Sequence, residues 1–329
     1  PHTIKSKEPS HAFYTFFCID VSQNWFDVAR YGATKVTRFP NNEDGFSALV
    51  GMLDAQALPD CFVVLEATGG YEMRLLRYLL TQGVAVHRVS PLHAKHFIRS
   101  LGHRAKTDQI DAKALALYAC ERHATLSLFV LPDENQKAFN ELMMRRQDLV
   151  AFAAAEKVRV TPPRYTDATA RVKQSVDTAL AFFAAQIEAI DAELDALVEA
   201  APELRARIET MRMIKGVGRL SAYTLQAFMP ELGNLTRRSA ASLAGCAPHA
   251  RDSGLKSRKR TVFGGRGTIR RILFLAAMSA RRYEPALKAF FEKLVANGKP
   301  KMVALTALMY KIVIIANAKL RSNTMQTTW

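Results

Sequence analysis

The chain has 329 residues, 49% of them hydrophobic, and carries 46 Lys and Arg against 30 Asp and Glu, a net charge of +16. This length allows two or three domains with buried cores of their own. The basic excess is high for a cytosolic enzyme of small molecules, and it predicts salt-sensitive binding to nucleic acid rather than to a membrane.

Neither a membrane span nor a signal peptide is expected. The longest apolar stretch, 303–318, contains Lys311 and is shorter than the ~20 apolar residues that a span requires. The N-terminus lacks the apolar segment of a signal peptide, and residues 1–12 are expected to be flexible. The four cysteines form no CxxC pair, so we expect free thiols of a reducing compartment at Cys18, Cys61, Cys120 and Cys246.

The N-terminal part of the chain alternates between strand and helix patterns. Three apolar runs rich in β-branched and aromatic residues predict consecutive antiparallel strands at 13–20, 25–31 and 35–39. Asn41 and Asn42 can cap the helix that follows. The next predicted elements are a strand, a helix, a strand and a helix, at 61–67, 71–82, 84–89 and from Pro91 onward. This order predicts an α/β layer fold with a mixed sheet.

Four acids stand at the ends or the starts of these elements. Asp20 and Glu66 each terminate a hydrophobic strand, where an unpaired carboxylate is costly unless it meets a cation. Asp108 and Asp111 lie on one face of the first turn of the next predicted helix. That pair alone could be acids favoured by the helix dipole. Together the four could converge at the end of the sheet and hold Mg²⁺ or Mn²⁺ through carboxylate oxygens.

The middle of the chain is strongly helical at 133–160 and 167–200. From Leu180 to Met211, apolar residues recur in alternating steps of three and four, which is the spacing of a heptad seam. The seam is compatible with a helix packed on its own domain, with a hairpin and with a coiled coil between subunits. Pro202 is expected to end the helix, because proline suits only a first helical turn.

Residues 214–222, IKGVGRLSA, have the glycine spacing of a helix-hairpin-helix. In that motif a tight turn, here containing Gly216 and Gly218, directs backbone N–H groups at a phosphate. The pattern is short, but its position shortly before a basic stretch favours contact with DNA.

The basic stretch holds ten Lys or Arg and one acid between Arg251 and Arg282. Ser253 lies in it next to Gly254, where a turn would bring the serine hydroxyl close to a bound phosphate. On its own, such a serine is more often the cap of a turn in a solvated loop. The cations expected to bind nucleic-acid phosphates are Arg251, Lys256, Arg258, Lys259, Arg260 and Arg266.

Two further helices are predicted near the C-terminus. One covers 268–282, with Arg270 and Arg271 exposed, and the other covers 301–320. Both would complete a small α-helical C-terminal domain.

The motifs occur in an order that resembles a known family. They are IDVSQ around Asp20, LEATGGY around Glu66, KTDQIDA around the aspartate pair, GVG, and APHARDSG before the basic stretch. In this order the chain resembles the DEDD insertion-sequence transposases and Piv-type DNA invertases, which include the bridge-RNA-guided recombinases. The resemblance implies an RNase H-like (RuvC-like) mixed-sheet domain, a coiled-coil helical hairpin and an α-helical transposase domain with the helix-hairpin-helix, at 13–130, 131–201 and 202–329.

The same resemblance implies the chemistry. Asp20, Glu66, Asp108 and Asp111 would bind the divalent metal, and Ser253 would attack the scissile phosphate and leave a covalent phosphoserine. The covalent link would conserve the phosphodiester energy, so strands could be rejoined without ATP. Because the serine and the acids lie in different domains, docking of domains or subunits would assemble the site.

The implied partners are double-stranded donor and target DNA, a bridge RNA that would choose the target, and copies of the chain in dimers that form a tetramer. The implied location is the prokaryotic cytoplasm, on the nucleoid. Three other functions are also compatible with the sequence. They are an RNA-independent site-specific invertase, a RuvC-type nuclease that attacks with water and uses Ser253 only as a phosphate ligand, and an architectural DNA-binding protein.

Overall fold

The computed structural model describes residues 13, 15–54, 58–102, 108–161, 165–249 and 261–326, with the side chains of all of them except 108–110, 249 and 323–326. The chain divides into two compact units, Pro1–Leu131 and Pro132–Trp329. The predicted nucleophile and most of the predicted phosphate ligands lie outside the described residues, namely Ser253, Arg251, Lys256, Arg258, Lys259 and Arg260.

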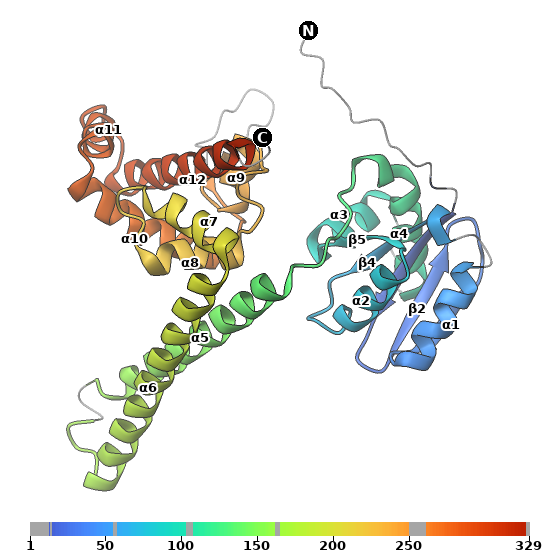
Figure 1. Cartoon of the computed structure of the whole chain (residues 1–329), viewed down its shortest axis with the longest axis horizontal. Helices are drawn as coiled ribbons and strands as arrows, with labels where there is room; N and C mark the ends of the chain where they lie inside the picture. Colours follow the sequence, from blue (N-terminus) through green and yellow to red (C-terminus); the bar gives the residue numbers. More distant parts are fainter. Residues whose placement is uncertain are drawn as a thin grey trace. The chain divides into compact units, whose positions relative to one another are not determined.

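The first unit is built on a five-stranded sheet in the order β3-β2-β1-β4-β5 (Figure 1). The first three strands pair antiparallel, as predicted, while β4 and β5 run parallel to β1. The sheet is therefore mixed, and the predicted α/β arrangement of this part of the chain is confirmed. The strands are β1 (Thr15–Val21), β2 (Trp25–Arg30), β3 (Val36–Pro40), β4 (Cys61–Glu66) and β5 (Ala85–Val89).

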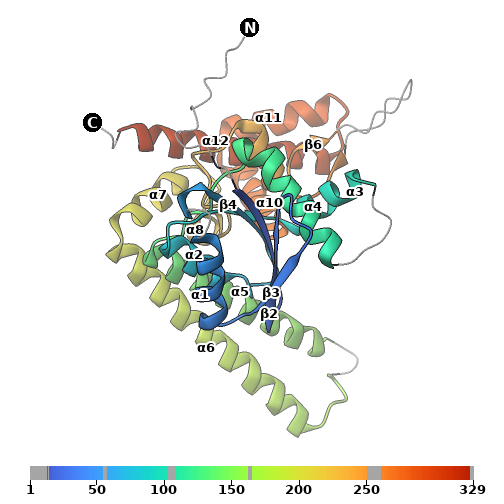
Figure 2. The same cartoon turned by 90° about the vertical axis from the view of Figure 1, so that its right-hand side faces the viewer.

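Helices cover both faces of this sheet, α1 and α2 on one side and α4 on the other (Figure 2). Side chains alternate between the faces along each strand. Ile19 and Leu65 pack with α1 and α2, whereas Cys18 and Val64 pack with α3 and α4. The helices are α1 (Glu43–Asp54), α2 (Met73–Thr81), α3 (Pro91–Ser100) and α4 (Asp108–Arg122), with 3₁₀ turns at Leu58–Asp60 and His123–Thr125.

The helix predicted after the two asparagines begins where expected. The Oδ1 atom of Asn42 accepts a hydrogen bond from the backbone N–H of Gly45 at 3.0 Å, which satisfies one of the free donors at the start of α1. Asn42 is thus the capping residue, and Asn41 is left for another role.

The second unit is helical apart from one short β-hairpin. Its hairpin strands are β6 (Pro248–His249) and β7 (Thr261–Val262). Its helices are α5 (Glu134–Arg159), α6 (Ala170–Ala200), α7 (Pro202–Arg212), α8 (Arg219–Phe228), α9 (Arg237–Leu243), α10 (Gly267–Tyr283), α11 (Pro285–Ala296) and α12 (Lys301–Gln326). As predicted, the helix break falls between Ala200 and Pro202.

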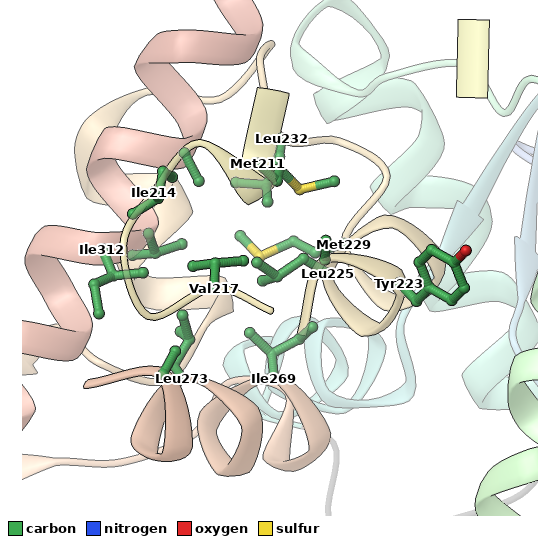
Figure 3. Close-up of a cluster of buried hydrophobic side chains, with 14 of the residues drawn as sticks. Met211, Ile214, Val217, Tyr223, Leu225, Met229, Leu232, Ile269, Leu273 and Ile312 are labelled. Carbon is green, nitrogen blue, oxygen red and sulfur yellow. The ribbon is translucent and has the colours of Figure 1, made fainter. Parts of the chain in front are cut away.

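One hydrophobic cluster runs through this unit. It joins the facing sides of α5 and α6 to the C-terminal helices. Around the α7–α8 turn, Val217 meets Ile269 and Leu273 of α10 and Ile312 of α12 (Figure 3). The hairpin and the C-terminal helices therefore share a continuous core, and the predicted boundary between them at residue 201 stays a prediction.

The predicted heptad seam is used within the chain. Ile190 and Leu194 of α6 are buried with Phe139 and Met143 of α5, and Arg146 of α5 forms a two-bond ion pair with Asp191 at 2.8 and 3.0 Å. The hairpin retains exposed apolar side chains, at Met144, Val150, Phe152, Val158, Val172 and Phe182. A contact between subunits stays a prediction, and it would have to use these exposed side chains, because the buried seam residues already pack within the chain.

The last helix is longer than the sequence indicates. Over Lys301–Ser322, α12 is long and apolar enough to cross a membrane by length and composition, which corrects the expectation that this stretch is too short. Half of that segment is buried inside the unit, and Leu308, Ile312 and Val313 belong to its core. A core helix of a helical unit accounts for this composition.

Candidate functional site

Asp20 and Glu66 stand side by side at the carboxyl ends of two neighbouring strands. β1 and β4 pair parallel with Ile19 opposite Leu65, so the next residues, Asp20 and Glu66, are neighbours across the strands. Both continue the alternate positions of Cys18 and Val64 and therefore share the face covered by α4. Both side chains are half-buried. We call this pair the carboxylate edge.

The negative charges of the carboxylate edge affect the pKa of a buried thiol in β1. Burial raises the pKa of the Cys18 thiol well above its ordinary value, and the nearby negative charges of Asp20 and Glu66 raise it further. The carboxylates of Asp20 and Glu66, on different strands, thus both raise the pKa of the same thiol, as expected if they lie close together.

The two aspartates of the KTDQIDA motif lie at the start of α4. Asp108 is its first residue, and its side chain lies outside the described ones. Asp111 is half-buried and directly precedes Ala112, which packs on the sheet with Leu115. The first turn of α4, the helix that covers this face of the sheet, therefore contains both predicted aspartates.

The fit of a divalent metal can be judged from these donors. Carboxylate oxygens are the ligands that Mg²⁺ and Mn²⁺ prefer, and Asp20 and Glu66 supply them in neighbouring positions. Among the described side chains, no group of three His, Cys, Asp or Glu lies close enough to hold a metal ion. A complete site needs Asp108 or a closer approach of Asp111, and the four-acid ligand set stays a prediction.

A buried ion pair that sequence reasoning missed fixes the loop after Glu66. Glu72 is fully buried, and its carboxylate accepts hydrogen bonds from the backbone N–H groups of Thr68 and Gly70 at 3.1 and 2.9 Å. The guanidinium of Arg88 on β5 donates two more, the one from Nε at 3.0 Å. Burial alone would raise the pKa of Glu72, but these hydrogen bonds hold the pKa below its ordinary value. Glu72 is therefore charged and holds the loop that follows Glu66 in one conformation.

Asn41 links the loops that follow the two strand ends. Its amide nitrogen donates to the carbonyl of Ser22, just after β1, at 2.9 Å and approaches the carbonyl of Tyr71, in the loop after Glu66, at 3.4 Å. Sequence reasoning assigned Asn41 only to capping. No local pattern reports this role, because its partners are 19 and 30 residues away.

A β-hairpin flanks the segment that contains Ser253, and we call this hairpin, with the contacts around it that are described below, the loop base. We call residues 250–260, which contain Ser253 and lie outside the described residues, the serine loop. Its two ends are joined by the β-hairpin, in which Pro248 pairs with Val262 and His249 pairs with Thr261. Ser253 is four residues after His249, so covalent geometry keeps it within about 14 Å of the hairpin.

A backbone crossing reinforces this base. Gly245 and Gly265 both have positive φ, 67° and 69°, and a Cβ on Gly265 would collide with the Gly245 backbone. A Cβ on Gly245 would lie 2.7 Å from the Gly264 carbonyl oxygen. Only glycine allows two chain segments to cross at this distance, so Gly265 has a packing role.

Arg266, a predicted phosphate ligand, has partners inside the protein. Its guanidinium donates to both carboxylate oxygens of Glu231, at 2.8 and 2.6 Å, and to the carbonyl of Phe228 at the end of α8, at 2.7 Å. Its backbone N–H donates to Leu243 at 2.8 Å. Arg266 therefore anchors the base of the serine loop, and a phosphate contact, which stays a prediction, would have to replace these bonds.

The glycines of the predicted helix-hairpin-helix differ in their surroundings. Gly216 has φ +95°, and a Cβ there would lie 2.5 Å from the Ala276 carbonyl oxygen and 2.7 Å from the Ala280 nitrogen of α10. Gly218 is exposed, with no atom within 4 Å of such a Cβ, and it caps α8. Two helices, α7 and α8, thus flank the two glycines, and close packing explains Gly216. The helix-hairpin-helix motif and a phosphate contact at either glycine stay predictions.

The arginines and cysteines near the loop base are partly as predicted. Arg271 is exposed, whereas Arg270 is half-buried against Gly245, because consecutive residues of α10 face different directions.

Burial raises the pKa of the Cys246 thiol to about 11, although the positive charge of the neighbouring Arg270 lowers it. All four cysteines are free, as expected.

Known proteins similar to this chain combine the same two regions. A transposase family model, the DEDD transposase of IS110 type, matches residues 18–162, and the model of the IS116/IS110/IS902 transposase family matches 208–292. The pilin gene-inverting proteins of Moraxella lacunata and Moraxella bovis are each 27% identical over 94% of this chain and 96% of their own length. An uncharacterized 43.6 kDa protein of insertion element IS110 from Streptomyces coelicolor is 29% identical over 42% of this chain and 34% of its own length.

The first match contains the carboxylate edge and the start of α4, and the second contains the loop base with Ser253. Both matches and the full-length relatives agree with the order of motifs read from the sequence. The chain therefore belongs to the IS110 family of transposases and Piv-type DNA invertases.

Proposed function

We propose that this protein cuts and rejoins DNA as the recombinase of an insertion sequence, with Ser253 as the nucleophile. The observation that carries the proposal is the parallel pairing of β1 and β4, because it brings Asp20 and Glu66 to neighbouring positions at the end of the sheet. A second support is the β6–β7 hairpin, which joins the two ends of the segment that carries Ser253.

In the proposed reaction the Oγ atom of Ser253 attacks the scissile phosphorus and loses its proton, while the bond from phosphorus to the leaving sugar oxygen breaks and that oxygen gains a proton. The product is a phosphoserine diester. A hydroxyl of another strand then attacks the same phosphorus, restores the DNA backbone and releases the serine. Asp20, Glu66, Asp108 and Asp111 would hold Mg²⁺ or Mn²⁺, which when bound supplies positive charge to the phosphate oxygens.

The cations of the serine loop would bind the DNA backbone. Arg251, Lys256, Arg258, Lys259 and Arg260 fall within ten consecutive residues with one acid between them. Such a cluster neutralises phosphates without reading sequence. We propose that a structured bridge RNA chooses the target.

A second candidate function is RNA-independent, site-specific DNA inversion. It is favoured by the relatives over nearly the full length of the chain, whose names describe inversion of a pilin gene. Ribonuclease treatment of the purified protein separates the two. Loss of recombination that returned with the RNA would support the guide, and unchanged recombination would support the invertase.

Assembly of the site is proposed to require several copies of the chain. The two groups of predicted residues lie in different units, and the α5–α6 hairpin exposes Phe152 and Phe182 for contact with a second copy. Dimers that form a tetramer on two duplexes, in the prokaryotic cytoplasm on the nucleoid, would bring acids and serine together. A monomer that cleaves efficiently at high dilution would contradict this.

The proposed function is tested by sequencing junctions. Wild-type protein, with its RNA retained, is incubated with Mg²⁺ and DNA that spans the candidate element junction, beside the Asp20→Asn variant. Recombinant junctions with wild type alone, at equal DNA binding, are expected. Junctions at the same yield from Asp20→Asn would contradict a role for the carboxylate edge, and binding without any junction from wild type would favour an architectural protein.

A further inference from the structure

A pocket of about 900 Å³ lies against the base of the serine loop. Its walls come from the start of α9, the hairpin β6–β7, α11 and α12. Pro248 and Thr261 of the hairpin line it, so the pocket is adjacent to the two ends of the chain segment that carries Ser253.

The chemistry of the walls is cationic and aromatic. Arg237 and Arg238 line one side and Tyr310 and Lys311 line another, and no acid occurs among the described residues of the lining. The Nζ atom of Lys311 lies 3.7 Å from the centroid of the Phe290 ring, so that cation is held in the wall by an aromatic face. Cations combined with an aromatic surface are what binds the backbone and the bases of unpaired nucleic acid.

The two arginines differ from other arginines of the same unit. Arg207 is held by Gln226, Pro230 and Leu232, and Arg266 is held by Glu231. Within the described part of the chain, no carboxylate or carbonyl partner is found for Arg237 or Arg238, and both are exposed. Among the described residues, neither charge is neutralised by a partner, in contrast to Arg207 and Arg266.

The size and position of the pocket select among nucleic-acid ligands. Its volume is typical of a site for one small ligand and does not accommodate a duplex. Ser253 lies within about 14 Å of the hairpin, a distance of about four base steps at ~3.4 Å each along a strand. A strand held at Ser253 can thus place a nearby base in the pocket.

We propose that this pocket binds an unpaired nucleotide of the DNA strand next to the phosphate attacked by Ser253, with the base against Tyr310 and the phosphates on Arg237 and Arg238. The inference rests on the proposed recombinase function, in which strands must separate before they are exchanged. It assigns a role to α9 and α12, which the predicted site does not include.

Binding of one labelled oligonucleotide as single-stranded DNA, single-stranded RNA and duplex DNA tests this proposal on the full-length protein. Replacing both Arg237 and Arg238 by Ala should lower the salt slope for single-stranded DNA by about 1.4, from ~0.7 per phosphate contact. Tyr310→Leu should weaken that binding about tenfold, whereas Tyr310→Phe, which keeps the ring, should not. The control removes two other exposed cations, Lys293 and Lys299, and should leave both values unchanged.

Loss confined to RNA or to duplex DNA would overturn the proposal, as would losses equal to those of the control. A photo-crosslinking amino acid at Val303, which lines the pocket, gives a second readout that does not depend on the folding of the other variants. It should crosslink to single-stranded DNA, whereas its neighbour Met302, exposed outside the lining, should not. A crosslink to residues 250–260 of the same chain instead would show that the serine loop fills the pocket.

The two proposals fail separately. If wild type forms recombinant junctions but the pocket variants bind and crosslink as wild type does, only the pocket assignment is wrong. If wild type forms no junctions while single-stranded DNA still depends on Arg237, Arg238 and Tyr310, the recombinase proposal fails and the nucleotide site stands.

Discussion

The carboxylate edge and the base of the serine loop solve the same positioning problem by different means. At the carboxylate edge, Asp20 and Glu66 lie directly on sheet strands, and the buried pair of Glu72 with Arg88 fixes the loop beyond them. At the loop base, the fixed parts are a hairpin with strands of two residues each, the crossing of Gly245 with Gly265, and the Arg266–Glu231 pair. Ser253 belongs to the segment between the two strands of this hairpin. The acids are thus placed by the sheet itself, whereas at the second region only the residues that flank 250–260 are fixed by described contacts.

The largest difference between the two regions should appear in catalysis. Asp20→Asn should lower strand cleavage about a thousandfold, because it removes several kcal/mol of charge stabilisation at the phosphate. Asp27 is the matched control, since it lies opposite Asp20 in the register, and its carboxylate accepts hydrogen bonds from Arg38 at 2.8 and 2.7 Å. Asp27→Asn should keep most of the cleavage, and an equal loss in a gel assay of both variants would show that the effect is not specific to Asp20.

The glycine crossing can be tested with two adjacent residues that have nearly the same φ. Gly264 and Gly265 have φ of 70° and 69°, but a Cβ collides with the Gly245 backbone only at Gly265. Gly265→Ala should cost about 3 kcal/mol of unfolding free energy, from strain and overpacking together, whereas Gly264→Ala should cost only about 1 kcal/mol of strain. Urea titrations that gave equal costs would mean that the crossing does not anchor the serine loop.

The Glu72–Arg88 ion pair next to the carboxylate edge should contribute a similar free energy of unfolding. Glu72→Ala leaves Arg88 without its partner in a partly buried position and should cost about 3 kcal/mol. Glu43→Ala, which removes an exposed partner of Arg74, should cost less than about 1 kcal/mol. If chemical denaturation shows the same small cost for both, the loop after Glu66 is held by something other than Glu72.

The serine loop and its base should separate in their response to salt. Substituting Arg258 and Arg260 together should lower the salt slope of DNA binding by about 1.8, from ~0.9 per phosphate contact. Arg266→Gln should leave the slope unchanged, because its guanidinium is bound to Glu231. A fall of the slope in Arg266→Gln would restore the original prediction that this residue binds phosphate.

The smallest effect concerns pH. Burial opposes ionisation of Glu231, but hydrogen bonds from Arg266 hold its pKa below the ordinary 4.5. A carboxyl group with a lowered folded pKa stabilises the protein above its unfolded pKa and loses this contribution as the pH falls through the folded value. Both side chains are about 40% exposed, so Glu231→Gln should cost only about 1 kcal/mol at neutral pH. The difference from wild type should vanish in acid, and a constant difference across the titration would exclude the linkage.

The sequence predicts the sheet and its acids because both depend on local patterns. Alternating apolar residues mark the strands, and an acid at the end of a strand is visible without a partner. The supporting contacts are not visible in this way. Arg266 reads as one more cation of a basic run, since its partner Glu231 is 35 residues away, and Gly216 reads as a phosphate turn, since the helix that requires it lies 60 residues later.

The proposed recombination mechanism depends most directly on whether Ser253 becomes linked to DNA. The decisive measurement is a denaturing gel of labelled junction DNA incubated with Mg²⁺ and wild type, Ser253→Ala or Asp20→Asn, followed by mass spectrometry of any adduct. We expect an adduct at Ser253 in wild type alone, with DNA binding retained in all three proteins. Strand cleavage without an adduct, persisting in Ser253→Ala and lost in Asp20→Asn, would instead identify a water-using nuclease of the RuvC type.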